Sequence, residues 1–88
     1  MSVYVDDLFP VMVTRKWRWP MVAHLVADSE EELHRFAASV GLRRPWYQQG
    51  HYHYDLTPNK RLAAIKAGAL QVSRREMARI VRGQAHGT

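Results

Sequence analysis

The chain has no cysteine, which excludes disulfide bonds, thiolate metal sites and cysteine nucleophiles together. A cysteine-free chain also fits a reducing compartment. No apolar run approaches the length of a membrane span, and no basic segment followed by an apolar stretch opens the chain. We therefore expect a soluble cytoplasmic protein without a transmembrane helix or a signal peptide.

The motifs of the commonest nucleotide enzymes are missing as well. The sequence has no Walker loop, no glycine fingerprint for a dinucleotide and no nucleophilic serine or threonine motif. These absences argue against a nucleoside triphosphatase and against a dehydrogenase. They leave open whether the protein is an enzyme at all.

What the chain does have is a strong positive charge on a short length. Its 88 residues suit a single domain over 1–83, followed by a flexible tail over 84–88. The net charge of +5 and the pI of about 10.1 favour a polyanionic partner, a nucleotide or a nucleic acid, because basic surface binds phosphate through counterion release. The alternative is that the late arginines are only the solvated face of an amphipathic helix.

Alternating strand and helix signals predict an α/β fold. The predicted strands are 2–5, 21–27, 51–56 and 69–72, and the predicted helices begin near Ser29, Thr57 and Ser73. Serine followed three residues later by glutamate, or threonine followed by proline, is typical of a helix start. This order predicts a small single-layer, largely parallel four-stranded sheet with about three helices.

The segment 8–20 follows no helical or strand period, so we expect an ordered loop there. Within it Trp17 and Trp19 alternate with cations. Tryptophans interleaved with cations can stack on the bases of a nucleotide or a nucleic acid. The alternative is that both indoles plug the core from the loop.

Acidic residues follow three of the predicted strands: Asp6 or Asp7, Asp28 and Asp55. If the strands are parallel, these carboxylates lie at one edge of the sheet, where open α/β sheets bind their ligands. The helix N-termini at the same edge attract anions. The cations that open two of the helices would then bind phosphate; they are Lys60, Arg61, Arg74 and Arg75.

The predicted strand 51–56 carries His51, His53 and Asp55 on one face, since strand side chains alternate. His24 could join them from a neighbouring strand. Imidazoles and carboxylates in this arrangement can hold a divalent transition metal or act as a general acid and base. A purely structural role for the histidines is the alternative.

The chain resembles the small bacterial and phage proteins grouped as domain of unknown function 4031. The resemblance covers nearly the whole chain and is carried by VYVD at 3–6, HLVAD at 24–28, HYDLTP at 53–58, GA at 68–69 and VSRREM at 72–77. It implies an intracellular bacterial or phage protein without an established activity. The residues it emphasises are Asp6, His24, Asp28, His53, Asp55 and Glu76, and His51 is not among them.

These observations favour a polar, phosphate-accepting site, with a divalent metal ion as a candidate cofactor, that acts on or binds a nucleotide or nucleic acid. The candidate catalytic residues are Asp6, His24, Asp28, His53 and Asp55, and the candidate phosphate ligands are Lys60, Arg61, Arg74 and Arg75. The alternative is a noncatalytic regulatory module that binds a host protein or a nucleic acid through its basic, tryptophan-rich surface. A third hypothesis is a purely structural fold whose partner surface forms a homodimer.

Overall fold

The computed structural model describes residues 2–48 and 52–86, with side chains described as far as residue 83. Its elements in chain order are β1 (Val3–Val5), β2 (Phe9–Pro10), β3 (Met21–Ala27), α1 (Glu30–Ser39), the 3-10 helix η1 (Arg44–Trp46), β4 (Tyr47–Gln48), β5 (His53–Leu56), α2 (Pro58–Lys66), β6 (Leu70–Gln71) and α3 (Arg74–His86). The predicted α/β class with three α-helices is confirmed for this part of the chain. His51, part of the predicted third strand, lies outside the described residues.

The sheet is mixed and has six strands. Its order is β4-β5-β3-β1-β6, and β2 pairs with β3 off this path. The central strand β3 runs antiparallel to both β1 and β5, and β4 runs antiparallel to β5. Among the described strands only β1 and β6 pair in parallel. The predicted largely parallel four-stranded sheet is therefore wrong.

The short strand β4 explains why β5 was expected to run parallel to β3. Strands β3 and β4 run in the same direction and are joined through α1, as alternating strands and helices predict. The chain then turns back at once, so that β5 inserts between β4 and β3 and opposes both. A two-residue strand inside a predicted loop has too few residues to show a period, so the reversal could not be found from the pattern.

Each helix begins where the sequence places a capping residue. The hydroxyl of Ser29 accepts a hydrogen bond from the N–H of Glu32 at 3.1 Å. Thr57 caps α2 in the same way through the N–H of Lys60, at 3.2 Å, and the serine at position 73 does so for α3. A cap of this kind contributes about 1 kcal/mol to helix stability.

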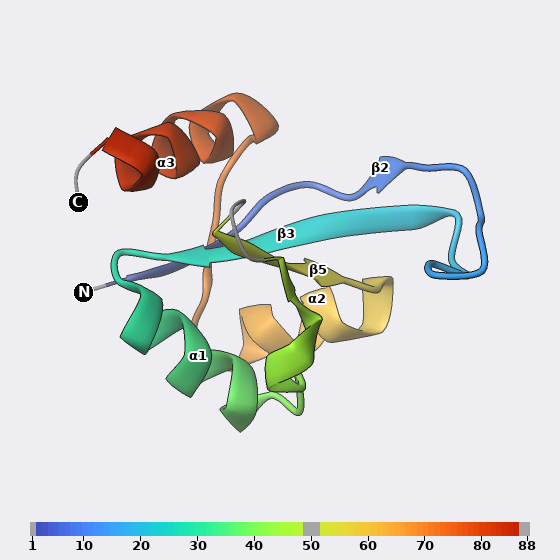
Figure 1. Cartoon of the computed structure of the whole chain (residues 1–88), viewed down its shortest axis with the longest axis horizontal. Coiled ribbons are helices and arrows are strands. Elements are labelled where there is room, and N and C mark those ends of the chain that lie inside the picture. Colours follow the sequence, from blue (N-terminus) through green and yellow to red (C-terminus); the bar gives the residue numbers. More distant parts are fainter. Residues whose placement is uncertain (1, 49–51, 87–88) are drawn as a thin grey trace.

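The helices cover both faces of the sheet. Figure 1 shows α1 and α2 on one side and α3 on the other. The side chains of Val5, Leu25 and Leu56 are fully buried in the core cluster with residues of α1 and α2. Since strand side chains alternate, His24 lies on the opposite face, toward α3. The fold thus places this histidine between the sheet and the last helix.

No helix in residues 2–48 or 52–86 is both long and apolar enough to cross a membrane. The backbone of α3 is helical as far as His86. The predicted flexible tail over 84–88 stays a prediction.

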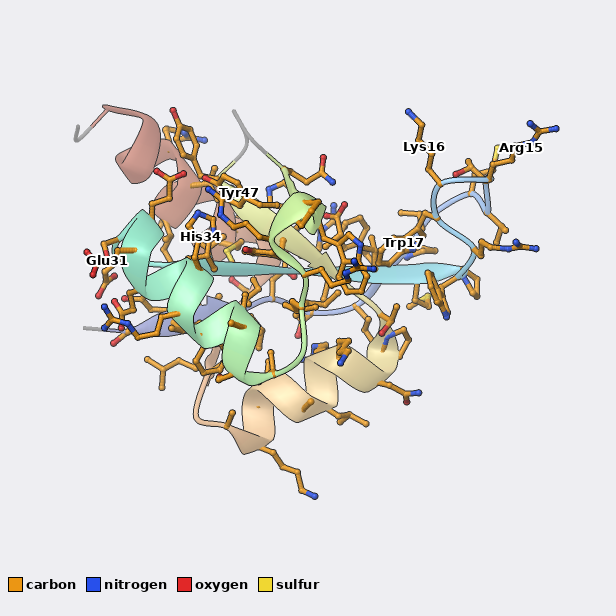
Figure 2. The ribbon with its side chains drawn as sticks, turned by 60° about the horizontal axis from the view of Figure 1, so that its bottom comes forward. Arg15, Lys16, Trp17, Glu31, His34 and Tyr47 are labelled. Atoms are coloured by element: carbon orange, nitrogen blue, oxygen red, sulfur yellow. The ribbon has the colours of Figure 1, made fainter. Side chains whose placement is uncertain are left out.

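A cluster of aromatic and polar side chains joins α1 to the strands β4 and β5. Figure 2 shows His34 and Tyr47 close together, and their rings lie 4.6 Å apart with an edge-on orientation. The hydroxyl of Tyr54 lies 2.8 Å from Nδ1 of His34. Burial raises the pKa of Tyr47 to about 12, with the charge of Glu30 adding to the effect.

This tyrosine predicts a loss of stability in strong base. The pKa of Tyr47 is higher in the folded state than the value of about 10 in an unfolded chain. The neutral phenol of Tyr47 therefore contributes fully to the free energy of unfolding below pH 10, and this contribution is lost as the pH rises toward 12. Urea unfolding at pH 9.5 and 11.5 should show a larger fall in unfolding free energy for the wild type than for Tyr47→Phe, by about 2 kcal/mol. The lysines titrate in both proteins, so an equal fall in both would contradict the prediction.

Candidate metal centre

Asp6 is the buried polar residue at the centre of the site. It follows β1 and has only 1% of its surface exposed. Its Oδ1 accepts a hydrogen bond from the backbone N–H of His24 at 2.6 Å, and its Oδ2 lies 2.8 Å from Nδ1 of the same residue. A carboxylate oxygen accepts hydrogen bonds, so this contact favours the tautomer of His24 with its proton on Nδ1. The lone pair of the imidazole is then on Nε2.

His53 and Asp55 meet that Nε2 from the neighbouring strand β5. Asp55 is the register partner of His24, and His53 lies two residues earlier on the same face. Nε2 of His24 lies 4.0 Å from Oδ1 of Asp55, and Nε2 of His53 lies 3.1 Å from the same oxygen. The two imidazole rings meet edge-on, with their centroids 4.5 Å apart. Three donor atoms therefore converge.

These three donors have the chemistry and spacing of a transition-metal site. One ligand atom from each of His24, His53 and Asp55 lies within 4.8 Å of the other two. A tetrahedral zinc with bonds of about 2.0–2.1 Å separates its ligand atoms by about 3.3 Å, so only small side-chain shifts are needed. Two histidines and one carboxylate leave coordination positions open for water or substrate.

Asp6 completes this arrangement without being a ligand. Metal-binding histidines usually donate their second ring N–H to a carboxylate, which fixes the tautomer and the ring orientation. Asp6 holds His24 in that way, through both the ring and the backbone. In addition, the backbone N–H of Asp6 donates to the carbonyl of His24 at 3.3 Å. The orientation of His24 is thus fixed by the sheet itself.

A cavity of about 400 Å³ opens between these side chains and α3. Its sheet side consists of Asp6, His24 and His53, and its helix side of Arg74, Met77, Ala78, Val81 and Arg82. The guanidinium of Arg74 lies over the ring of Phe9, 4.2 Å from its centroid. Two guanidinium-bearing side chains, Arg74 and Arg82, therefore line the same cavity as the histidines.

The structure separates Asp28 from the other candidate acids. Strand β3 opposes β1, so its C-terminal end lies beside the start of β1. There the Asp28 carboxylate accepts hydrogen bonds from the N–H of Ser2 and the hydroxyl of Tyr4, both at 2.8 Å. The bond to Asp28, with burial, raises the pKa of Tyr4. The predicted meeting of three acidic strand ends at one edge is therefore wrong, because it required parallel strands.

Two of the four predicted phosphate ligands make contacts within the fold. Nζ of Lys60 donates to the carbonyl of Val40 at 2.9 Å, at the C-terminal end of α1. Nε of Arg61 donates to the carbonyl of Asp6 at 2.9 Å, and its side chain is only 14% exposed. Both side chains therefore tie α2 to the rest of the molecule.

The remaining cations lie on α3. Arg74 and Arg75 are both exposed, but only Arg74 lines the cavity. Arg82 lines the cavity too, although it was not among the predicted phosphate ligands. Arg74, Ala78 and Arg82 are spaced by four residues, which places them on one side of a helix. That spacing was the signal that could have found Arg82. Glu76, which the resemblance emphasised, is exposed in the first turn of the same helix.

Residues 3–84 match the sequence model of a family described as a protein of unknown function, DUF4031. The match spans nearly the whole chain, so the chain belongs to this family, as the resemblance predicted. No curated protein and no solved structure matches the chain. The function must therefore be argued from the site.

The Asp6 contacts predict the tautomer of His24. The wild type should carry the ring proton on Nδ1. In Asp6→Asn the side-chain oxygen can still accept from the backbone N–H, but the amide NH₂ then faces Nδ1 and moves the ring proton to Nε2. Long-range proton–nitrogen NMR of the histidine rings distinguishes the two tautomers.

Asp28→Asn is the matched control, since Asp28 also accepts a backbone and a side-chain hydrogen bond but lies away from His24. It should leave the His24 tautomer unchanged. Asp6→Asn should also lower the unfolding free energy, by about 1–2 kcal/mol, because hydrogen bonds to a carboxylate are replaced by weaker neutral ones. A proton on Nε2 of His24 in the wild type would contradict the assignment.

Proposed function

We propose that this DUF4031 protein is a metal-dependent protein that acts on a phosphate-containing ligand, a nucleotide or a nucleic acid. The observation that carries the proposal is the convergence of His24, His53 and Asp55, with Asp6 behind His24. The chemistry of this donor set suits zinc or another late first-row divalent metal. A metal with open positions can polarise a phosphoryl oxygen and activate a water molecule.

The charge distribution supports an anionic ligand. Arg74 and Arg82 line the cavity that contains the histidines, and guanidinium groups bind phosphate oxygens through paired N–H donors. In this proposal the two arginines hold the phosphate, and the metal ligands face the reacting oxygen. The roles first considered for Lys60 and Arg61 pass to these arginines, because Lys60 and Arg61 already bond to backbone carbonyls.

The setting that we propose is the cytoplasm of a bacterium or of a phage-infected cell. The lack of cysteine fits a reducing compartment, and the resemblance to small bacterial and phage proteins supports the origin.

A noncatalytic nucleic-acid-binding module is the second candidate. It is favoured by the positive charge of +5 and by exposed tryptophans, Trp19 and Trp46, at 45% and 46% exposure. The two candidates differ in what the histidines do. If the protein is only a binding module, substitution of His53 changes neither metal binding nor any reaction.

Metal titration tests the first proposal. Calorimetry with zinc chloride should give one binding site per chain for the wild type, and His53→Gln should weaken that site by at least about tenfold because a ligand is lost. Cobalt provides a second readout, since its visible spectrum reports the number and type of ligands. His34→Gln is the control, because His34 lies in α1 and contacts Tyr54 rather than the cluster. Equal zinc affinity in the wild type and His53→Gln would refute the proposal.

If Arg74 and Arg82 hold the phosphate, substrate binding in the metal-dependent reaction should depend on their positive charge. With bis-p-nitrophenyl phosphate as the probe, Arg82→Ala should raise KM by about tenfold, the loss expected for one charge-assisted contact of about 1.5 kcal/mol. Arg79→Ala removes the same charge from the same helix at a position outside the cavity wall, so its KM should stay at the wild-type value. The same change of KM in both variants would show a general charge effect and contradict the proposed contact.

A further inference from the structure

A second cavity, of about 550 Å³, lies beside Asp55. We call it the tryptophan cavity, because Trp17, Trp19 and Trp46 line it together with Lys16 and Gln48. Asp55 is part of its wall as well as a member of the histidine cluster. A ligand in this cavity would therefore lie next to the candidate metal centre.

The fold holds the indoles in place while leaving two of them open to solvent. Nε1 of Trp17 donates to the carbonyl of Met21 at 3.2 Å, which fixes the first ring against β3. Trp19 packs edge-on against Trp17, with centroids 5.1 Å apart. Trp19 and Trp46 nevertheless keep 45% and 46% of their surface exposed. Exposed aromatic surface that lines a cavity marks a binding site rather than a core.

The loop that carries two of the tryptophans is strongly cationic. Figure 2 shows Arg15 and Lys16 extending outward from its tip, while Trp17 lies back over the body of the protein. Arg18 adds a third cation, and residues 8–27 contain no acidic residue. Aromatic faces next to cations suit a ligand with flat rings and repeated negative charges.

We propose that the tryptophan cavity holds one unpaired base of a single-stranded nucleic acid, whose backbone passes the cluster of His24, His53 and Asp55. The base would stack on the exposed indoles, with the amide of Gln48 available for a hydrogen bond. The neighbouring phosphates would lie along Arg15, Lys16 and Arg18. The inference rests on the proposed function for the chemistry at the cluster, but base binding itself needs no metal.

The observations favour this ligand over its rivals. An acidic peptide would satisfy the cations but has no regular supply of flat rings for three indoles. Bases inside a duplex are stacked on each other, so their faces are not available to tryptophan. A single nucleotide would fill the cavity but would leave the cations at the loop tip without phosphates.

Fluorescence anisotropy of a labelled twelve-residue oligothymidylate tests the inference. In EDTA, which removes any metal, the wild type should bind the strand, and Trp46→Ala should weaken binding by about 5- to 150-fold, the equivalent of about 1–3 kcal/mol for one stacked base. Trp46→Phe keeps an aromatic face and should restore most of the affinity. Met12→Ala is the control for loss of an exposed apolar side chain, since Met12 is 85% exposed and does not line the cavity.

A pair of lysine variants tests the path of the backbone. Lys16→Ala should weaken binding and reduce the slope of affinity against salt by about one, because one phosphate contact is lost. Lys66→Ala removes an equal charge from the far end of α2 and should leave that slope unchanged. The same slope in Lys16→Ala and the wild type would overturn this part of the inference.

The outcomes separate this inference from the proposed function. If Trp46→Ala binds the strand as tightly as the wild type, or if a duplex or thymidine monophosphate competes as well as the strand, the inference is overturned whatever the metal titration shows. If the strand binds as expected but zinc does not, the proposed function fails and base binding stands. Trp46→Ala should keep the wild-type circular dichroism spectrum and urea unfolding midpoint, which shows independently of any metal that the variant is folded.

Discussion

The candidate site depends on one buried carboxylate, that of Asp6. It joins the end of β1 to the middle of β3 through the backbone N–H and the ring of His24. The backbone carbonyl of Asp6 accepts a hydrogen bond from Nε of Arg61, so α2 is tied to the same residue. Burial of a carboxylate is costly unless it is hydrogen-bonded, and these contacts supply the compensation. The geometry of the site and the packing of the fold therefore share one residue.

The antiparallel pairing of β3 with both of its neighbours determines which residues meet. Strands β1 and β5 run in the same direction on either side of β3, so residues near their C-terminal ends lie beside the middle of β3, next to His24. Asp6 and Asp55 meet at this histidine, while Asp28, at the end of β3, lies far along the sheet. Several of the residues selected from the sequence thus come together for a different physical reason from the one that selected them.

Features set by neighbouring residues could be predicted from the sequence, whereas features that depend on tertiary contacts could not. The strand 21–27 and the capped starts of α1 and α2 follow from period and capping chemistry, which act over a few residues. The two-residue strands β2 and β4 exist only because β3 and β5 supply their partners. In the same way, Lys60 and Arg61 look like free cations at a helix start, and only the folded chain brings a carbonyl to each.

In the proposed function, the two cavities have different roles: one binds a base and the other holds the metal ligands. Asp55 belongs to the wall of the tryptophan cavity and to the histidine cluster, so it is the point at which a bound strand would meet the metal. The tryptophans lie in the loop before β3 and in η1, whereas the arginines of the first cavity lie on α3. Because stacking and metal ligation use different elements, a change in one should alter affinity without altering the other. If both proposals hold, one small domain binds a strand and acts on it at adjacent places on the same sheet.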